Sequence, residues 1–170
     1  MVHYSEEMVV ERRLSNRRGN SRDLRFMRAA IAEAKAAAKE GNAPIGAVIV
    51  RKGRIVERGH NKVFTSHDVT AHAEVVVIRK MTKRHSSFDL KGYTLYTTFI
   101  PCATCTVTTL RTNIPAVVYG AEAKDAPQFS SGIHQKINHE TITLAKSKIN
   151  FTGGILREEC AQLLRNVRPD

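Results

Sequence analysis

The sequence predicts an α/β fold in which helices cover both faces of a central mixed sheet. Segments with helical periodicity alternate with short segments rich in β-branched residues, and this order is typical of a sheet enclosed by helices. Two of the predicted strands flank Lys52-Gly53, which is a hairpin signal. Because a hairpin pairs its strands antiparallel, it makes the predicted sheet a mixed one.

The first half of the chain begins with a helix. Asn20 or Ser21 provides its N-cap, and Gly41-Asn42 ends it. The elements expected in this half are a helix over 21–40, strands over 46–51 and 54–58, a loop over 59–70 and a helix over 71–84.

The second half starts with a strand rich in aromatic and β-branched residues. Pro101 then suits the start of a helix. The segment 121–135 carries no clear pattern. The elements expected here are a strand over 93–98, a helix over 102–112, a strand over 116–120, a helix over 139–146, a strand over 149–151 and a helix over 155–167.

Length and composition suit one globular domain. The chain has 170 residues, of which 42% are apolar. We expect a basic extension over residues 1–20 and a folded domain over 21–170. No apolar run approaches the roughly 18 residues of a membrane helix, and the first ten residues carry Glu6 and Glu7 without a long apolar core. A soluble cytoplasmic protein without a membrane partner is therefore expected.

Basic residues are concentrated near the N-terminus. Lys and Arg total 27 against 16 acids, a net charge of +11. Seven arginines face only Asp23 within their span: Arg12, Arg13, Arg17, Arg18, Arg22, Arg25 and Arg28. Such a segment can bind nucleic acid by displacing counterions from phosphates. A solvated arm, or one that packs on a partner subunit, is favoured instead, because no aromatic residue interleaves the arginines before Phe26.

Two short stretches carry the candidate chemistry. One is Thr70-Ala71-His72-Ala73-Glu74 and the other is Pro101-Cys102-Ala103-Thr104-Cys105, and 27 residues separate Glu74 from Cys102. Cysteines three apart on a helix share a face and can bind one ion, and a helix N-terminus favours the thiolate. An odd count of three cysteines does not suit a disulfide framework, and Cys160 reads as a buried apolar residue.

The ligand types indicate a catalytic zinc site. Two thiolates of Cys102 and Cys105 with a neutral His72 imidazole balance the charge of Zn²⁺. Three protein ligands leave a fourth tetrahedral position for water, whose pKa zinc lowers to about 7. Glu74 is poorly placed as a fourth ligand but can reach that water. The alternative is a structural zinc knot or a redox pair beside an unrelated His and Glu.

With these motifs the chain resembles the cytidine and deoxycytidylate deaminase superfamily, and more narrowly the branch of guanine, cytosine and tRNA adenosine deaminases. H-x-E followed by P-C-x-x-C is the signature of zinc nucleobase deaminases. The likeness spans about residues 22–167 and implies a three-layer α/β/α sandwich with a five-stranded mixed sheet, usually a homodimer. It implies that Zn²⁺ is held by His72, Cys102 and Cys105, and that Glu74 is the catalytic acid/base.

The resemblance also implies substrate-binding residues. Asn61 matches an asparagine that bonds the substrate's base, although an asparagine here also suits a turn. Asp125 falls where guanine deaminases carry an aspartate that accepts from the purine's amino and ring N–H groups; alternatively it caps the next helix. The Gly- and Ala-rich loop of bacterial tRNA deaminases is absent here.

Three positions depart from the branch's usual pattern: Ile100 replaces Glu, Ala103-Thr104 replaces a pair containing Met, and Val69 replaces Pro. Because Ile100 and Thr104 are expected near the pocket, these changes bear on the substrate. The favoured prediction is deamination of a small nucleobase or nucleoside, guanine first and cytosine-type substrates next. The alternatives are tRNA adenosine-to-inosine deamination and a non-catalytic zinc-binding subunit, against which the intact Glu74 argues.

Overall fold

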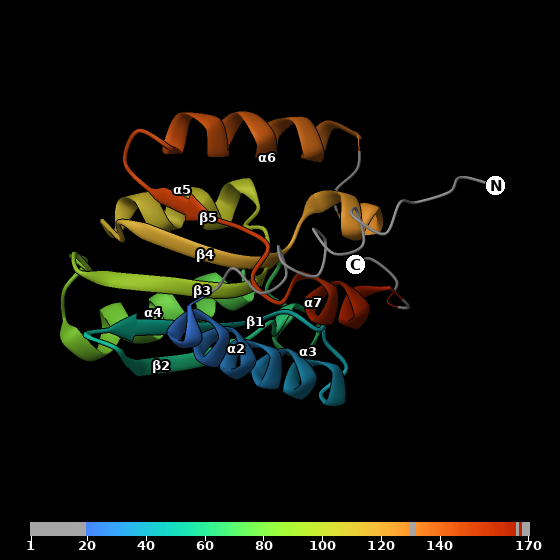
Figure 1. Ribbon diagram of the computed structural model, residues 1–170, viewed down its shortest axis with the longest axis horizontal. Helices are drawn as coiled ribbons and strands as arrows, with labels where there is room; N and C mark the ends of the chain where they lie inside the picture. Colours follow the sequence, from blue (N-terminus) through green and yellow to red (C-terminus); the bar gives the residue numbers. More distant parts are fainter. Residues whose placement is uncertain (1–19, 130–131, 166, 168–170) are drawn as a thin grey trace.

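The chain folds around one five-stranded sheet in a computed structural model, which describes residues 20–129, 132–165 and 167. Residues 1–19 of the predicted extension, with four of the seven N-terminal arginines, lie outside the described residues. The strands are β1 (Gly46–Arg51), β2 (Arg54–His60), β3 (Tyr93–Phe99), β4 (Ala116–Ala121) and β5 (Asn150–Thr152). Their order across the sheet is β2-β1-β3-β4-β5 (Figure 1).

The sheet is mixed, as predicted. β1 runs antiparallel to both β2 and β3, while β3, β4 and β5 are parallel to one another. Lys52 and Gly53 form the predicted hairpin turn, both at positive φ (48° and 71°), which is the backbone geometry that matches the twist of paired strands.

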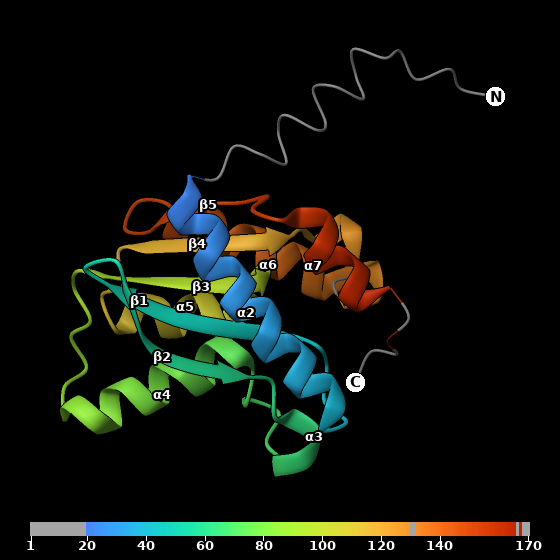
Figure 2. The ribbon, with the colours of Figure 1, turned by 60° about the horizontal axis from the view of Figure 1, so that its bottom comes forward.

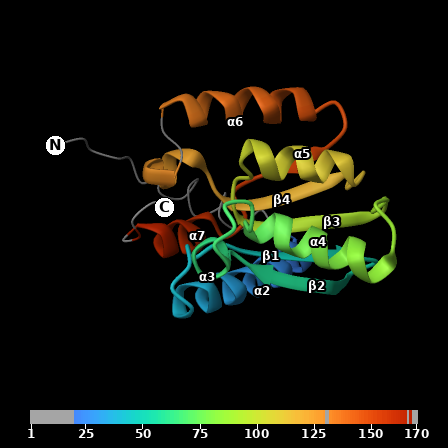
Figure 3. The same ribbon diagram turned by 180° about the vertical axis from the view of Figure 1, so that it is seen from behind.

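Helices cover both faces of the sheet. They are α2 (Ser21–Lys39), α3 (Val63–Ser66), α4 (Ala73–His85), α5 (Ala103–Arg111), α6 (Gly132–Ala145) and α7 (Arg157–Leu164). α2 and α7 pack with Val48 and Val50 on one face, whereas α4 and α6 join the cluster of Ala47 and Ile49 on the other. Successive strand residues point to opposite faces, so one strand serves both cores. Figure 2 shows α2 crossing one face, and Figure 3 shows α4 and α5 over the opposite face.

Several element boundaries differ from the prediction. The expected loop over 59–70 contains the single turn α3, and α6 is longer than the predicted 139–146. The last helix begins only at Arg157, because Leu156 has a left-handed backbone conformation (φ 52°) that no α-helix continues. The unassigned segment forms two short 3₁₀ turns, Ala123–Asp125 and Pro127–Phe129. Across the described ranges, no helix combines the length and apolar character needed to cross a membrane.

The start of β1 and the end of β3 meet at one end of the central strands of the sheet. Because these strands are antiparallel, Ala47 lies opposite Thr97, and the amide of Gly46 donates to Thr98 Oγ1 at 3.1 Å. Gly46 is needed there, since a Cβ would lie 2.1 Å from the carbonyl oxygen of Ala30 on α2. The candidate site lies at this end of the strands, where α5 follows β3 after a short connection.

Candidate active site

The three predicted metal ligands converge on one point. Cys102 Sγ, Cys105 Sγ and His72 Nδ1 lie 3.4 Å from one another along each side of a triangle, and they are the group among the described residues that could hold a metal ion. Tetrahedral zinc with bonds of about 2.3 Å to sulfur and about 2.0 Å to nitrogen would separate its ligands by roughly 3.5–3.8 Å. The triangle therefore fits zinc with small adjustments.

Both motifs lie at helix N-termini. His72 is the N-cap residue of α4, and Cys102 is the N-cap residue of α5, where its Sγ accepts from the amide of Cys105 at 3.4 Å. The predicted helices over 71–84 and 102–112 thus begin slightly later than expected, which places His72 and Cys102 at the caps, while Cys105 lies in the first turn of α5. The positive ends of two helix dipoles point at the site and favour thiolates there.

The two cysteines have opposite pKa shifts. The hydrogen bond from Cys105 is the main cause that lowers the pKa of Cys102, to about 4, and His72 lowers it further. The pKa of Cys105 is raised, first because it donates that bond and second because it is buried. One thiolate is therefore already favoured in this cluster, and a bound cation would favour the second.

Glu74 lies beside this triangle in a buried position. Its side chain belongs to the first turn of α4 and is 3% exposed. Oε1 accepts from Thr97 Oγ1 at 3.1 Å, and Oε2 lies 3.5 Å from Cys105 Sγ. Burial is the main cause that raises the pKa of Glu74, and the charge of Cys102 adds to it. A carboxyl group with a raised pKa beside a metal triangle is suited to proton transfer.

Asn61 lines the same cavity from the end of β2. It is buried, its amide donates to the carbonyl of Ile45 at 2.9 Å, and Oδ1 accepts from the amide of Val63 at 3.1 Å. This turn-like bond uses only the carbonyl oxygen of the side chain, so Asn61 can be a turn residue and still hydrogen-bond a substrate's base. Its Nδ2 remains as a hydrogen-bond donor toward a ligand in the cavity.

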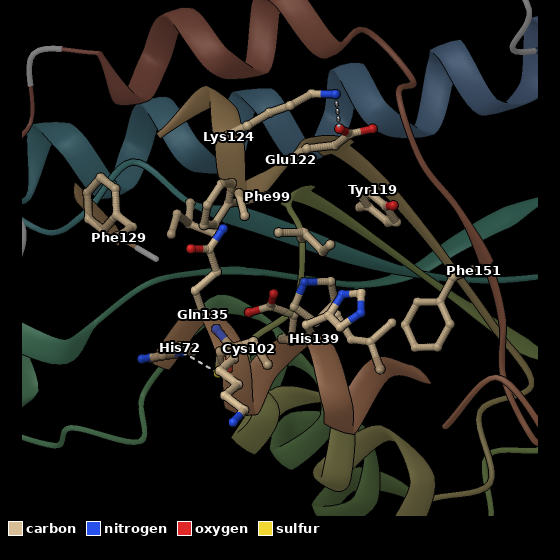
Figure 4. A pocket seen from close by; sticks show the side chains of 18 of the residues that line it. His72, Phe99, Cys102, Tyr119, Glu122, Lys124, Phe129, Gln135, His139 and Phe151 are labelled. Carbon is tan, nitrogen blue, oxygen red and sulfur yellow. Dashed lines mark hydrogen bonds and ion pairs between the residues drawn. The ribbon is translucent and has the colours of Figure 1, made fainter. Parts of the chain in front are cut away.

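The cavity has a volume of about 760 Å³ and two different walls. His72, Glu74 and Cys102 lie on one wall. The other wall is formed by the segment after β4 and by α6, which contributes Gln135 and His139 (Figure 4). Figure 4 also shows Phe99 and Phe129 on one side of His139 and Phe151 on the other.

Asp125 is not among the residues that line this cavity. Its carboxylate accepts two hydrogen bonds of 2.8 Å from the guanidinium of Arg157, and Oδ2 also accepts from the amide of Glu122 at 2.8 Å. Burial acts to raise the pKa of Asp125, but the bonds from Arg157 and Glu122 outweigh it and the pKa is lowered. The structure therefore places Asp125 in a capping box of a 3₁₀ turn and in an ion pair, rather than beside Glu74.

The residues that depart from the usual family pattern do not all lie in the cavity. Ile100 lines the cavity as expected, whereas Thr104 is exposed and does not line it. Val69 is 81% exposed. The expectation for Cys160 is confirmed, since it is fully buried in the core between the sheet and α7.

Sequence reasoning missed two supporting residues. Thr97 holds the carboxylate of Glu74, and Asn138 on α6 accepts from the amide of Ala103 at 2.8 Å, in the first turn of the cysteine helix. Neither has a local sequence signal. Thr97 looks like an ordinary strand residue, and Asn138 lies 35 residues from its partner.

Comparisons with known proteins agree with this geometry. Residues 20–121 match the cytidine and deoxycytidylate deaminase zinc-binding region. The tRNA-specific adenosine deaminase of Buchnera aphidicola subsp. Schizaphis graminum is 34% identical over 147 residues, 86% of this chain and 94% of that protein.

Two solved structures extend the comparison. One, from a study of A-to-I editing by tRNA:A34 deaminases at the wobble position of transfer RNA, is 31% identical with a TM-score of 0.70, and the match covers 82% of this chain and 99% of that one. The guanine deaminase of Bacillus subtilis is 39% identical with a TM-score of 0.58, over 63% of this chain and 68% of that one.

Proposed function

We propose that this chain, which belongs to the cytidine and deoxycytidylate deaminase family, is a zinc-dependent hydrolase that deaminates adenosine in tRNA. The observation that carries the proposal is the match to a tRNA-specific adenosine deaminase over 94% of that protein's length. The sequence alone placed guanine ahead of tRNA. The relatives favour the reverse order, since tRNA-specific adenosine deaminases are 34–35% identical over 85–86% of this chain, whereas the Bacillus subtilis guanine deaminase matches 63% of it.

The placement of Asp125 supports the same order. The guanine prediction relied on a carboxylate that faces the purine edge. Here the carboxylate of Asp125 already accepts hydrogen bonds from Arg157 and from the amide of Glu122. Breaking such charged bonds to bind a purine would cost about 1.5–3 kcal/mol per bond. Guanine remains the second candidate because a guanine deaminase is 39% identical over the shared region.

The metal site supplies the electrophilic part of the chemistry. His72, Cys102 and Cys105 would hold the ion, as their 3.4 Å triangle and their ligand types indicate. Zinc, when bound, acts as a Lewis acid that makes water a competent nucleophile near neutral pH.

Glu74 would transfer the protons. In the proposed reaction, water adds to C6 of adenine and the exocyclic nitrogen leaves as ammonia, which yields inosine. Glu74 Oε2 would accept a proton from the water and deliver protons to the ring nitrogen and to the leaving nitrogen. Thr97 fixes the other oxygen by its 3.1 Å hydrogen bond, and Asn61 Nδ2 would donate to the substrate and hold it in place.

The test compares substrates directly. The purified zinc-loaded protein is incubated with tRNA that carries adenosine at the anticodon wobble position, and separately with guanine, cytosine and free adenosine. Inosine in digested tRNA is measured by mass spectrometry, and ammonia release is measured for the free bases. We expect inosine formation that Glu74→Gln abolishes. Ammonia from guanine with unchanged tRNA would replace this proposal with the second candidate.

The homodimer and the cytoplasmic location stay predictions. Sedimentation of the full chain would test the first, and cell fractionation would test the second. Binding of nucleic acid through the N-terminal arginines concerns residues mostly outside the described part of the chain, and the RNA test with residues 1–20 deleted would measure it.

A further inference from the structure

The active-site cavity continues into a groove between α6 and the edge of the sheet. A second cavity of about 500 Å³ adjoins the first and shares Lys146 and Phe151 with it. Pro115, Lys148 and Asn150 line the far part. The catalytic residues all lie in the first cavity, so the groove extends beyond the space that the reacting base would fill.

Aromatic rings line the sheet side of this groove. Val117 lies opposite Phe151 in the parallel pairing of β4 with β5, and Tyr119 is two residues further along β4, so all three side chains point to the face that α6 covers. Figure 4 shows Tyr119 and Phe151 at the end of the cavity away from His72. Gly153 packs against the ring of Tyr119, and a Cβ added at Gly153 would lie 2.4 Å from that ring.

Lysines line the α6 side. The helix presents Gln135, His139 and Ile142 at intervals of four and three, and Lys146 follows at the same periodicity. Among the described residues, Lys146 and Lys148 form no ion pair. The acids that line the two cavities are Glu74, at the catalytic centre, and Glu122, which pairs with Lys124 at 3.0 Å (Figure 4). The groove therefore carries uncompensated positive charge.

We propose that the groove of Tyr119, Phe151, Lys146 and Lys148 binds the single-stranded RNA that adjoins the target adenosine, an inference that rests on the proposed function. Rings that accept stacked bases, together with cations that follow the phosphates, are the combination by which proteins hold single-stranded nucleic acid. Because the active-site cavity of about 760 Å³ is far larger than a single base, we expect a free base to occupy the catalytic end alone.

The first measurement is RNA affinity. Variants are made in the Glu74→Gln background, which blocks turnover, and the probe is an anticodon stem-loop with adenosine at the wobble position. Phe151→Leu keeps an apolar side chain but removes the ring, and we expect its Kd to rise about 5-fold, the lower end for a lost stacked base. Lys146→Ala should reduce the slope of log K against log salt by about 0.7, the value for one phosphate contact on a single strand.

Two exposed residues outside the groove provide matched controls. Phe88→Ala removes a ring that is 79% exposed between α4 and β3. Lys35→Ala removes one exposed cation from α2. Neither should change the Kd or the salt slope beyond the general effect of net charge. Melting curves on all four variants identify any loss that comes from unfolding.

The second measurement locates the RNA. A photoreactive 4-thiouridine is placed immediately 5′ or 3′ of the adenosine, and crosslinked peptides are identified by mass spectrometry. A crosslink to the segment that contains Tyr119 or Phe151, from either position, supports the groove. Crosslinks that map only elsewhere overturn it.

The outcomes separate the two proposals. Inosine formation by the unmutated enzyme tests the function. If it is present while the groove variants match their controls in Kd and salt slope, the groove proposal is wrong and the function stands. In an active groove variant, KM for RNA should rise with kcat unchanged. If these substitutions instead alter only the oligomeric state, the groove is an interface between copies of the chain and the RNA proposal is overturned.

Discussion

The two walls of the cavity are built differently. On the catalytic wall, Glu74 is 3% exposed, and Thr97 and Cys105 lie fully buried behind it. Hydrogen bonds hold each of the three. On the α6 wall, Gln135 and His139 are exposed. Groups that stabilise charge developing in a reaction must be preorganised in a medium of low dielectric. The buried wall is therefore suited to the chemistry, and the exposed wall is open to contact with a larger substrate.

Two carboxylates show the same contrast. Burial raises the pKa of Glu74, whereas Arg157 and the amide of Glu122 outweigh burial and lower the pKa of Asp125. A group that must take up and release a proton benefits from the first environment. A group that must stay charged to hold a turn benefits from the second. Each of the following predictions tests this division.

The largest expected effect follows removal of a metal ligand. Cys102→Ala should lower zinc from about one ion per chain, the stoichiometry expected of a three-ligand site, to near zero and should abolish turnover. Elemental analysis of unchelated protein measures the zinc. Cys160→Ala is the matched control, because that buried cysteine lies in the core on the other face of the sheet, and it should keep both zinc and activity.

Glu74→Gln should keep zinc and the fold but lose about 10²- to 10⁴-fold in kcat, the usual contribution of a general acid–base group. Gln has nearly the same shape but cannot transfer protons, and Thr97 can still bond to its side-chain oxygen. Single-turnover kinetics on RNA, with zinc analysis of the same sample, make the measurement. Retention of more than about a tenth of the activity would contradict the role of Glu74.

Asn138→Ala tests whether the exposed wall also supports the catalytic wall. It removes the acceptor for the amide of Ala103, beside Cys102, and groups that orient metal ligands typically contribute 10- to 100-fold in affinity or activity. We expect about a 10-fold loss of zinc affinity, measured by competition with a chelator. Gln135→Ala, on the same helix and without a hydrogen bond among the described residues, should leave zinc affinity unchanged.

The smallest effect on chemistry is expected for Asp125→Asn. It should reduce the free energy of unfolding by about 1.5–3 kcal/mol, because it weakens charged hydrogen bonds to Arg157. The ratio of kcat/KM between substrates should stay constant. A selective loss on guanine would instead restore the base-reading role.

The pH dependence of this effect has a defined sign. The pKa of Asp125 is lowered in the folded state, so its stabilisation is present above the unfolded pKa of about 3.9 and disappears as the pH falls through the folded value. Denaturant unfolding of both proteins at neutral and at acidic pH checks this. The difference in stability should be full at neutral pH and should shrink below about pH 4.

The sequence by itself determined the features that depend on near neighbours. Asn20 caps α2 through bonds to the next few amides, and Lys52-Gly53 turns the hairpin within two residues. Cys102 and Cys105 share one helical turn. The strand pattern and the ligand types were therefore readable without coordinates, because spacing and backbone preference decide them locally. Boundaries such as the start of α7 were less accurate, since Leu156 has a left-handed conformation that its residue type does not predict.

Only the tertiary structure decided which distant groups meet. Asp125 looked free to read a base until the fold brought Arg157, 32 residues away, onto its carboxylate. Asn138 became part of the metal site only because α6 packs on α5. The aromatic and basic groove likewise exists because β5 pairs with β4 beneath α6. Such contacts depend on how whole elements pack, and sequence spacing carries no record of a partner that is thirty residues away.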